Sequence, residues 1–249
     1  MKVLFAGESW SVLLTHTKGF DHVGLGRYYE AGGPLIDALT KSGHDVTYMP
    51  NHVAQLDFPF TLGELKTYDA VIFSDCGSNT MLLHPKMQFE CVRMPNRLSV
   101  IKEYVENGGG FLMCGGYMSY AGYEGKARYS MTPIADILPV DILPYDDRIE
   151  APNGIIPKII DDTHPVLQGI DNSKWTDFLG YNKLTLKQDA ALIATIDEDV
   201  FMAAREYGKG RTFTFASDCV PHWAPPEFNQ WDGYALLFSN IVRWLAGEL

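Results

Sequence analysis

The stretch Gly108-Gly109-Gly110-Phe111-Leu112-Met113-Cys114-Gly115-Gly116-Tyr117 decides the fold that the sequence predicts. Three glycines precede a short apolar run, and the run ends in a cysteine followed by two more glycines. This pattern predicts a buried strand from Phe111 to Cys114 that turns sharply at its carboxyl end. Small residues at such a turn let a ligand and backbone N–H groups approach closely. We therefore expect a functional site there.

Other short apolar runs alternate with helical patterns through the first half of the chain. The predicted strands are 3–6, 45–49 and 70–74, and the predicted helices are 33–42, 62–65 and 97–107. Each strand is mostly a continuous apolar run, which is typical of a parallel sheet covered on both faces. The residues between the first strand and the first helix are interpreted as a loop. The sequence thus predicts an α/β fold.

The pattern changes from about Ala135, where prolines interrupt short strand-like pieces at 138–140, 142–147 and 155–157. Proline is tolerated in edge strands, so we expect an edge or an inserted antiparallel section here. Further strands are predicted at 189–196, 200–206 and 211–216, with a tight hairpin turn at Gly208-Lys209-Gly210. A helix from Asp232 to Leu245 closes a single domain spanning residues 1–249.

Composition excludes several classes of partner. The chain has 249 residues and a formal net charge of −11, so we expect neither nucleic acid nor an anionic membrane to bind it. Glu8 follows Met1 too closely for a signal peptide, and no apolar run is long enough to span a membrane. The four cysteines are scattered, which favours free thiols in a reducing compartment. We expect a cytoplasmic protein whose partner is a small molecule or another protein.

The carboxyl ends of parallel strands form the ligand site in folds of this kind. This rule selects three segments that we expect to meet in space: Gly7-Glu8-Ser9, Asp75-Cys76-Gly77 and Cys114-Gly115-Gly116.

Cys114 is the candidate nucleophile. A reactive cysteine needs a base and N–H donors for an oxyanion, and Gly115 or Gly77 could supply the donors. The alternative is that Cys114 is a small buried residue that ends a strand.

His222 is the candidate base, because it follows the last predicted strand, and Asp218 or Glu227 could orient its ring. The alternative is a loop histidine that packs beside Trp223 and prolines. Glu8 could be held protonated and donate a hydrogen bond to sulfur, or it could be an ordinary loop carboxylate.

Two further groups complete the candidate site. Asp75 and Asp218 could bind a cation together, but their spacing is not that of a metal motif, so we predict no metal and no cofactor. Aromatic residues could either wall a pocket or belong to the core; they are Trp10, Tyr117, Tyr120, Tyr181 and Trp223.

The chain resembles the class I glutamine amidotransferase-like superfamily over essentially its whole length. The resemblance rests on the elbow 111–116 and on the segments 72–78 and 217–223. Within the superfamily the chain is most similar to bacterial amidotransferase-like proteins of unassigned substrate. Specific matches there are Asn51-His52-Val53, Ser78-Asn79-Thr80, Gly115-Gly116-Tyr117-Met118-Ser119, Leu143-Pro144-Tyr145-Asp146-Asp147-Arg148 and Pro225-Pro226-Glu227-Phe228.

This resemblance implies a flavodoxin-like three-layer sandwich. It also implies that Cys114 is the elbow nucleophile, that His222 and an acid complete a triad, and that Gly77 lies near the oxyanion donor. Glu8 would match a carboxylate of the DJ-1-like relatives. True glutaminases have the pattern Gly-x-Cys-x-Gly and an acid two residues after the histidine, whereas this chain has Leu112 and Ala224.

Three functional hypotheses follow. The first is a hydrolase or amidase that uses Cys114, His222 and Glu8 or Glu227 on a small molecule. The second is a non-catalytic protein that binds a small ligand or carbohydrate, with Asp75, Asp218 and His222 contacting hydroxyls. The third is a component of a homo-oligomeric assembly.

Overall fold

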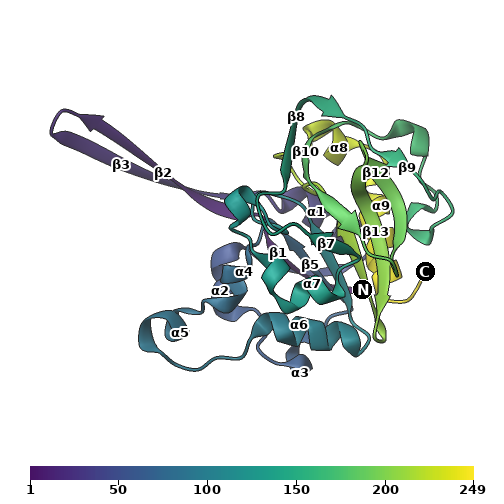
Figure 1. Ribbon diagram of the computed structural model, residues 1–249, viewed down its shortest axis with the longest axis horizontal. Coiled ribbons are helices and arrows are strands. Elements are labelled where there is room, and N and C mark those ends of the chain that lie inside the picture. The colour runs from purple at the N-terminus through teal and green to yellow at the C-terminus, as the bar shows by residue number, and fades with distance from the viewer.

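The computed structural model describes residues 1–249 and is built on one eight-stranded sheet (Figure 1). Its strand order is β4-β1-β5-β6-β14-β13-β12-β9. The first five of these strands are parallel to one another: β4 (Asp45–Met49), β1 (Lys2–Gly7), β5 (Ala70–Ser74), β6 (Gly110–Cys114) and β14 (Gly210–Phe215). Their carboxyl ends therefore lie along one edge of the sheet.

Helices cover both faces of this sheet, which confirms the predicted three-layer α/β sandwich. On one face α1 (Gly33–Lys41) packs against α9 (Gly233–Leu245). The other face carries α2 (Asn51–Asp57), α3 (Leu62–Leu65), α4 (Ser78–Leu82), α6 (Arg97–Glu106) and α7 (Pro133–Ile137). Two short helices complete the set, α5 (Pro85–Glu90) and α8 (Pro226–Gln230).

The buried Arg97 joins the helices on the second face. Its guanidinium donates hydrogen bonds of 2.8–3.0 Å to four backbone carbonyls, those of Ala54, Gln55, Thr80 and Met81. These carbonyls belong to α2 and α4, so one side chain satisfies polar groups that would otherwise be buried without partners.

The second half of the chain forms the predicted antiparallel section. In the main sheet β13 (Asp199–Tyr207) and β12 (Ala191–Ile196) are antiparallel, and β9 (Lys158–Ile159) is the edge strand. Two small antiparallel sheets adjoin it, formed by β8 (Arg148–Ile155) with β10 (Phe178–Asn182) and by β7 (Val140–Ile142) with β11 (Leu184–Leu186). The turn predicted at Gly208 joins β13 to β14.

One element differs from the sequence interpretation. The residues interpreted as a loop between the first strand and the first helix form a long hairpin of β2 (Ser9–Lys18) and β3 (Asp21–Glu30). This hairpin, called the arm below, projects from the body of the molecule (Figure 1). Its strands pair only with each other, and most of their side chains are exposed. The loop interpretation was wrong because neither strand has a fully buried apolar run.

Candidate functional site

A cavity of about 480 Å³ lies at the carboxyl edge of the parallel strands. Its lining comes from the start of β2 (Ser9–Lys18) and from the segments that follow β1, β5, β6 and β14: Glu8, Trp10, Asp75, Tyr117, Asp218, Pro221 and His222. Five of these are residues that the sequence selected as catalytic or ligand-binding, and they come from distant parts of the chain. The fold therefore brings most of the predicted carboxyl groups together with the predicted histidine.

Glu8 lies directly after β1 and is almost completely buried. Its φ of +46° is unusual for a residue with a side chain, and such backbone conformations are concentrated at functional sites. The Ser74 hydroxyl donates a 2.5 Å hydrogen bond to Glu8 Oε1. Burial, together with the nearby Cys219, Asp218 and Asp75, raises the pKa of Glu8 well above its usual value. The surroundings of Glu8 thus favour its neutral, protonated form over the carboxylate.

Asp75 occupies the equivalent position after β5 and also has a positive φ, of +45°. Its Oδ1 accepts a 2.6 Å hydrogen bond from the backbone N–H of Met118. Burial, and then the neighbouring Asp218 carboxylate, raises the pKa of Asp75 to about 6. Asp75 is therefore largely ionised at pH 7, at a cost in stability.

Asp218 and His222 form a hydrogen-bonded pair after β14. The His222 Nδ1 lies 2.9 Å from Asp218 Oδ2, and the same carboxylate oxygen accepts the backbone N–H of Trp223 at 2.9 Å. Asp218 is buried, whereas the His222 side chain is 45% exposed at the cavity. The hydrogen bond to Asp218 raises the pKa of His222. Asp218, not Glu227, is therefore the group that orients the imidazole.

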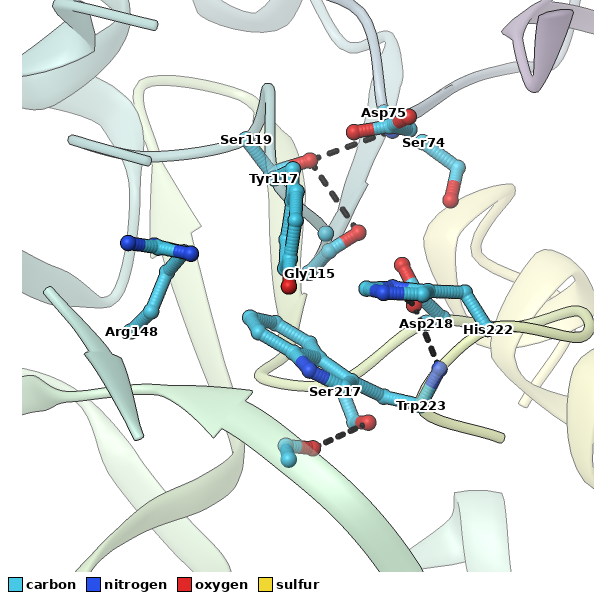
Figure 2. A network of polar contacts seen from close by, with 12 residues as sticks. Ser74, Asp75, Gly115, Tyr117, Ser119, Arg148, Ser217, Asp218, His222 and Trp223 are labelled. Carbon is cyan, nitrogen blue, oxygen red and sulfur yellow. Dashed lines mark hydrogen bonds and ion pairs between the residues drawn. The ribbon is translucent and has the colours of Figure 1, made fainter. Parts of the chain in front are cut away.

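Aromatic rings form one wall of the cavity (Figure 2). The Tyr117 and His222 rings lie edge to face, with their centroids 4.4 Å apart. The Trp223 ring stacks on His222, with their centroids 5.4 Å apart. Glu150 of β8 accepts hydrogen bonds from the Tyr117 hydroxyl (3.0 Å) and from the Trp223 indole N–H (2.9 Å). The Arg148 guanidinium lies over the Tyr117 ring at 4.8 Å. The wall is thus fixed by polar contacts from the antiparallel section.

The turn after β6 brings backbone next to the carboxylates. A Cβ added at Gly116 would lie 2.6 Å from Asp218 Oδ1 and 3.0 Å from Asp75 Oδ1, and the φ of Gly116 is +133°. Only glycine fits this position. The Gly115 N–H donates to the carbonyls of Phe215 and Ser217, and the Gly116 N–H donates to Asn182 Oδ1. Both N–H groups are therefore already paired within the chain.

Cys114 does not line the cavity. It is the last residue of β6, and it is completely buried. Its thiol is a neighbour of Cys219, whose pKa is raised by burial and by Cys114, and the Cys219 thiol lies 3.3 Å from Ser74 Oγ. The thiols of Cys114 and Cys219 are thus part of the packed interior under the site.

The remaining predicted residues lie outside the cavity lining. Gly77 precedes α4 and faces the Met118 side chain, and Glu227 is exposed in the first turn of α8. Tyr181 is buried, and its hydroxyl donates to Asp199. Tyr120 is also buried, with its hydroxyl donating to the Met113 carbonyl.

Several residues that hold the site in place were not named as site residues in the sequence analysis. Ser74, Ser119, Asn182 and Glu150 all hold site residues through hydrogen bonds. Ser74 could have been found, because it ends the strand before Asp75. Glu150 could not, because it reaches the site only through the placement of the antiparallel section.

A second cavity, of about 370 Å³, lies at the amino ends of β5 and β6, beside Asp69 and Gly109. It holds no cluster of acidic side chains. No group of three or more His, Cys, Asp or Glu side chains in the structure has the arrangement of a metal site.

The fold and the position of the cavity define an α/β sandwich protein with its site at the strand ends. A family model described as "Putative glutamine amidotransferase" matches residues 2–247, and the chain belongs to this family. No curated protein sequence matches the chain.

Solved structures agree with this assignment. The chain is 42% identical to the cytoplasmic protein STM3548 of Salmonella typhimurium, with a TM-score of 0.95 over 98% of this chain and 99% of that one. It is also 42% identical to the cytoplasmic protein STM1381 of Salmonella typhimurium LT2, with a TM-score of 0.94 over the same shares.

A ThuA-like protein of Bacteroides uniformis is 12% identical, with a TM-score of 0.55 over 98% of this chain and 90% of that one, and shares the fold. No helix of the present structure has the length and apolar character needed to cross a membrane.

Proposed function

We propose that the cavity binds a small polyhydroxylated molecule of the carbohydrate class, held by the carboxyl groups and stacked on the aromatic wall. The observation that carries this proposal is the convergence of Glu8, Asp75 and Asp218 on one cavity beside the Tyr117 ring. Sugars present hydroxyls on their edges and C–H groups on their faces, so carboxyl groups and aromatic rings match both.

The hydrogen-bonding capacity of the carboxyl groups supports hydroxyls rather than a simple cation as the ligand. Burial favours the protonated form of Glu8, which can donate a hydrogen bond, whereas a carboxylate such as that of Asp75 can only accept one. A hydroxyl both donates and accepts, so it can satisfy both kinds of group at once. A cationic amine would only donate and would leave the Glu8 proton without an acceptor.

Binding is tested by thermal shift and calorimetry with a panel of pentoses, hexoses and their polyols. An alkylamine and glutamine of similar size are the matched comparisons. We expect a sugar or polyol to stabilise the protein, and Asp218→Asn to lose that stabilisation. Glu227→Gln, which changes an exposed carboxylate outside the cavity, should bind normally. Stabilisation by the amine alone, or equal binding by Asp218→Asn, would count against the proposal.

A second candidate function is acid–base catalysis on the bound molecule. It is favoured by the Asp218–His222 pair, whose Nδ1 is fixed while the rest of the ring is exposed at the cavity. Such a pair can accept a proton, and the protonated Glu8 can return one. Exchange of ligand C–H for deuterium in D₂O, seen by NMR and lost in His222→Gln, would reveal this activity.

A hydrolase or amidase that depends on Cys114 has weaker support, because that thiol is buried and the N–H groups at Gly115 and Gly116 are paired. Cys114→Ser separates the two proposals. It should leave binding intact under our proposal and should abolish any thiol-dependent turnover under the alternative. We also propose that the protein acts in the cytoplasm, which is supported by its four free cysteines and by its cytoplasmic relatives.

A further inference from the structure

The arm has two different faces. Side chains alternate along each strand, and the register pairs Trp10 with Tyr29 and Leu14 with Leu25 on one face. Val23 lies on the same face, opposite His16. We call these five residues (Trp10, Leu14, Val23, Leu25 and Tyr29) the apolar face. Val12 with Arg27, and Lys18 with Asp21, lie on the same side as these five residues. The other face carries Ser11, Leu13, Thr15 and Thr17 along β2, paired with Tyr28, Gly26, Gly24 and His22, so its exposed apolar side chains are fewer, Leu13 and Tyr28.

The apolar face is open to solvent and continuous with the cavity. Its five residues are 40–59% exposed, and Trp10 lines the cavity while stacking on Tyr29 at 5.9 Å. At the tip, Phe20 is fully exposed. The base of the opposite face is anchored to the body, because the Tyr28 hydroxyl lies 3.2 Å from His52 Nδ1. Apolar side chains therefore follow this face from the cavity mouth toward the tip, with Arg27 between the two apolar pairs and the Lys18–Asp21 pair beside the tip.

An isolated two-stranded ribbon is at best marginally stable in water. The match to the Salmonella relative covers 98% of this chain, so it includes most of the arm, which is about a tenth of the chain. An exposed apolar surface that does not pack on its own body is suited to packing on another molecule.

We propose that the arm's apolar face is the contact between two copies of this chain. In this contact two arms pack face to face and antiparallel about a two-fold axis, so that the tip of each lies at the base of the other. Each cavity mouth would then be bordered by Phe20 of the partner subunit beside Trp10.

The area of the apolar face supports a second copy as the occupant. Its five partly exposed side chains present roughly 400–500 Å² of apolar surface, given that a large side chain covers about 150–250 Å². A stable interface buries about 800 Å² per partner, of which roughly 60% is apolar. The apolar face therefore supplies about the apolar area that one partner of a dimer needs, and each strand of ten residues gives the arm a reach of about 30 Å.

Charge also favours contact through the arms. Lys18 and Arg27 balance Asp21 and Glu30, so the arm is formally neutral and the net charge of −11 belongs to the rest of the chain. Two acidic bodies repel each other at close range, and an arm-to-arm contact joins two copies through their neutral parts. A two-fold contact also uses the same surface on both copies, which is the commonest way for identical chains to associate.

The test is the mass of the ligand-free protein in solution, by light scattering and sedimentation at about 50 µM. We expect about twice the chain mass of 27.9 kDa. The double variant Leu14→Lys/Leu25→Glu should be a monomer, because it places a cross-strand ion pair on the apolar face while keeping the arm neutral.

The matched control is Thr15→Lys/Thr17→Glu, which makes the same charge change on the opposite face and should remain dimeric. Circular dichroism of both variants should match that of the wild type, since the strands of the arm pair only with each other and neither variant changes a residue of the body. A monomeric wild type, or dissociation by both double variants alike, would overturn the proposal. So would a dimer that survives Leu14→Lys/Leu25→Glu. None of these readouts depends on the identity of the cavity's ligand.

Discussion

Asp75→Asn should stabilise the protein above pH 6 and change its stability little below pH 4. In the folded chain, burial and Asp218 raise the pKa of Asp75 from its ordinary 3.8 to about 6. The folded state therefore holds a proton that the unfolded state has already released, and stability falls as the pH rises from about 4 to 6. At about 1.4 kcal/mol per tenfold change, the full loss is at most about 3 kcal/mol.

Asparagine is a clean replacement at this position. Its side-chain oxygen can still accept the Met118 N–H, and asparagine tolerates a positive φ better than other residues with side chains. The variant keeps the shape and removes only the charge. It should therefore recover up to about 3 kcal/mol of unfolding free energy at pH 7–8.

The assay is urea unfolding of the wild type and Asp75→Asn at half-unit intervals from pH 4 to 8. Glu227→Gln serves as the control for an exposed carboxylate. The difference between wild type and Asp75→Asn should open between pH 4 and 6 and stay constant above. A variant that is less stable at pH 8, or a difference that does not depend on pH, would refute the electrostatic account of the cavity.

Three further predictions concern other parts of the structure. Asp218→Asn should lower the pKa of His222, because the hydrogen bond to the Asp218 carboxylate is the main cause of the raised pKa. An NMR titration of the imidazole protons measures that pKa, and an unchanged titration midpoint would contradict the prediction. Gly116→Ala should lower the free energy of unfolding in urea by roughly 2–4 kcal/mol, because of the positive φ there and because the new Cβ would meet two carboxylates. The control Gly63→Ala, whose Cβ would have open space around it, should lower it little or not at all. Equal effects of the two substitutions would argue against the close approach of Gly116 to the carboxylates. Arg97→Met should lose roughly 3–5 kcal/mol by the same assay, because four buried carbonyls lose their donor, and a loss below 1 kcal/mol would show that water replaces it.

The central fold could be predicted because burial on both faces leaves a strong pattern. The apolar runs at 70–74 and 111–114 are completely buried strands, and the helix predicted at 97–107 has its bounds within one residue of the structure. Glycines and prolines marked most of the turns between them. These features depend on local composition, which the sequence displays directly.

The arm could not be predicted by the same reasoning. Its apolar residues Leu14 and Leu25 face one side of a ribbon that the body does not cover, so no continuous apolar run identifies its strands. The turn at Gly19 carries a positive φ, but a single glycine is a weak signal.

The candidate site was predictable in position but not in detail. The rule on strand ends placed Glu8 and Asp75 on one rim, and the structure brings them together there with Asp218, which the sequence suggested as the partner of His222. It could not decide the direction of Cys114, because successive side chains of a strand point to opposite faces and a shift of one residue reverses them. The structure directs Cys114 into the interior and leaves Gly116 beside the carboxylates.

The most direct test of the proposed site is a crystal structure of the protein soaked with the sugar or polyol that stabilises it best. The account predicts density for the ligand in the cavity, with hydroxyls within hydrogen-bonding distance of Asp75 and Asp218 and one face against Tyr117. A covalent adduct on Cys114, or a ligand bound only outside this cavity, would contradict it.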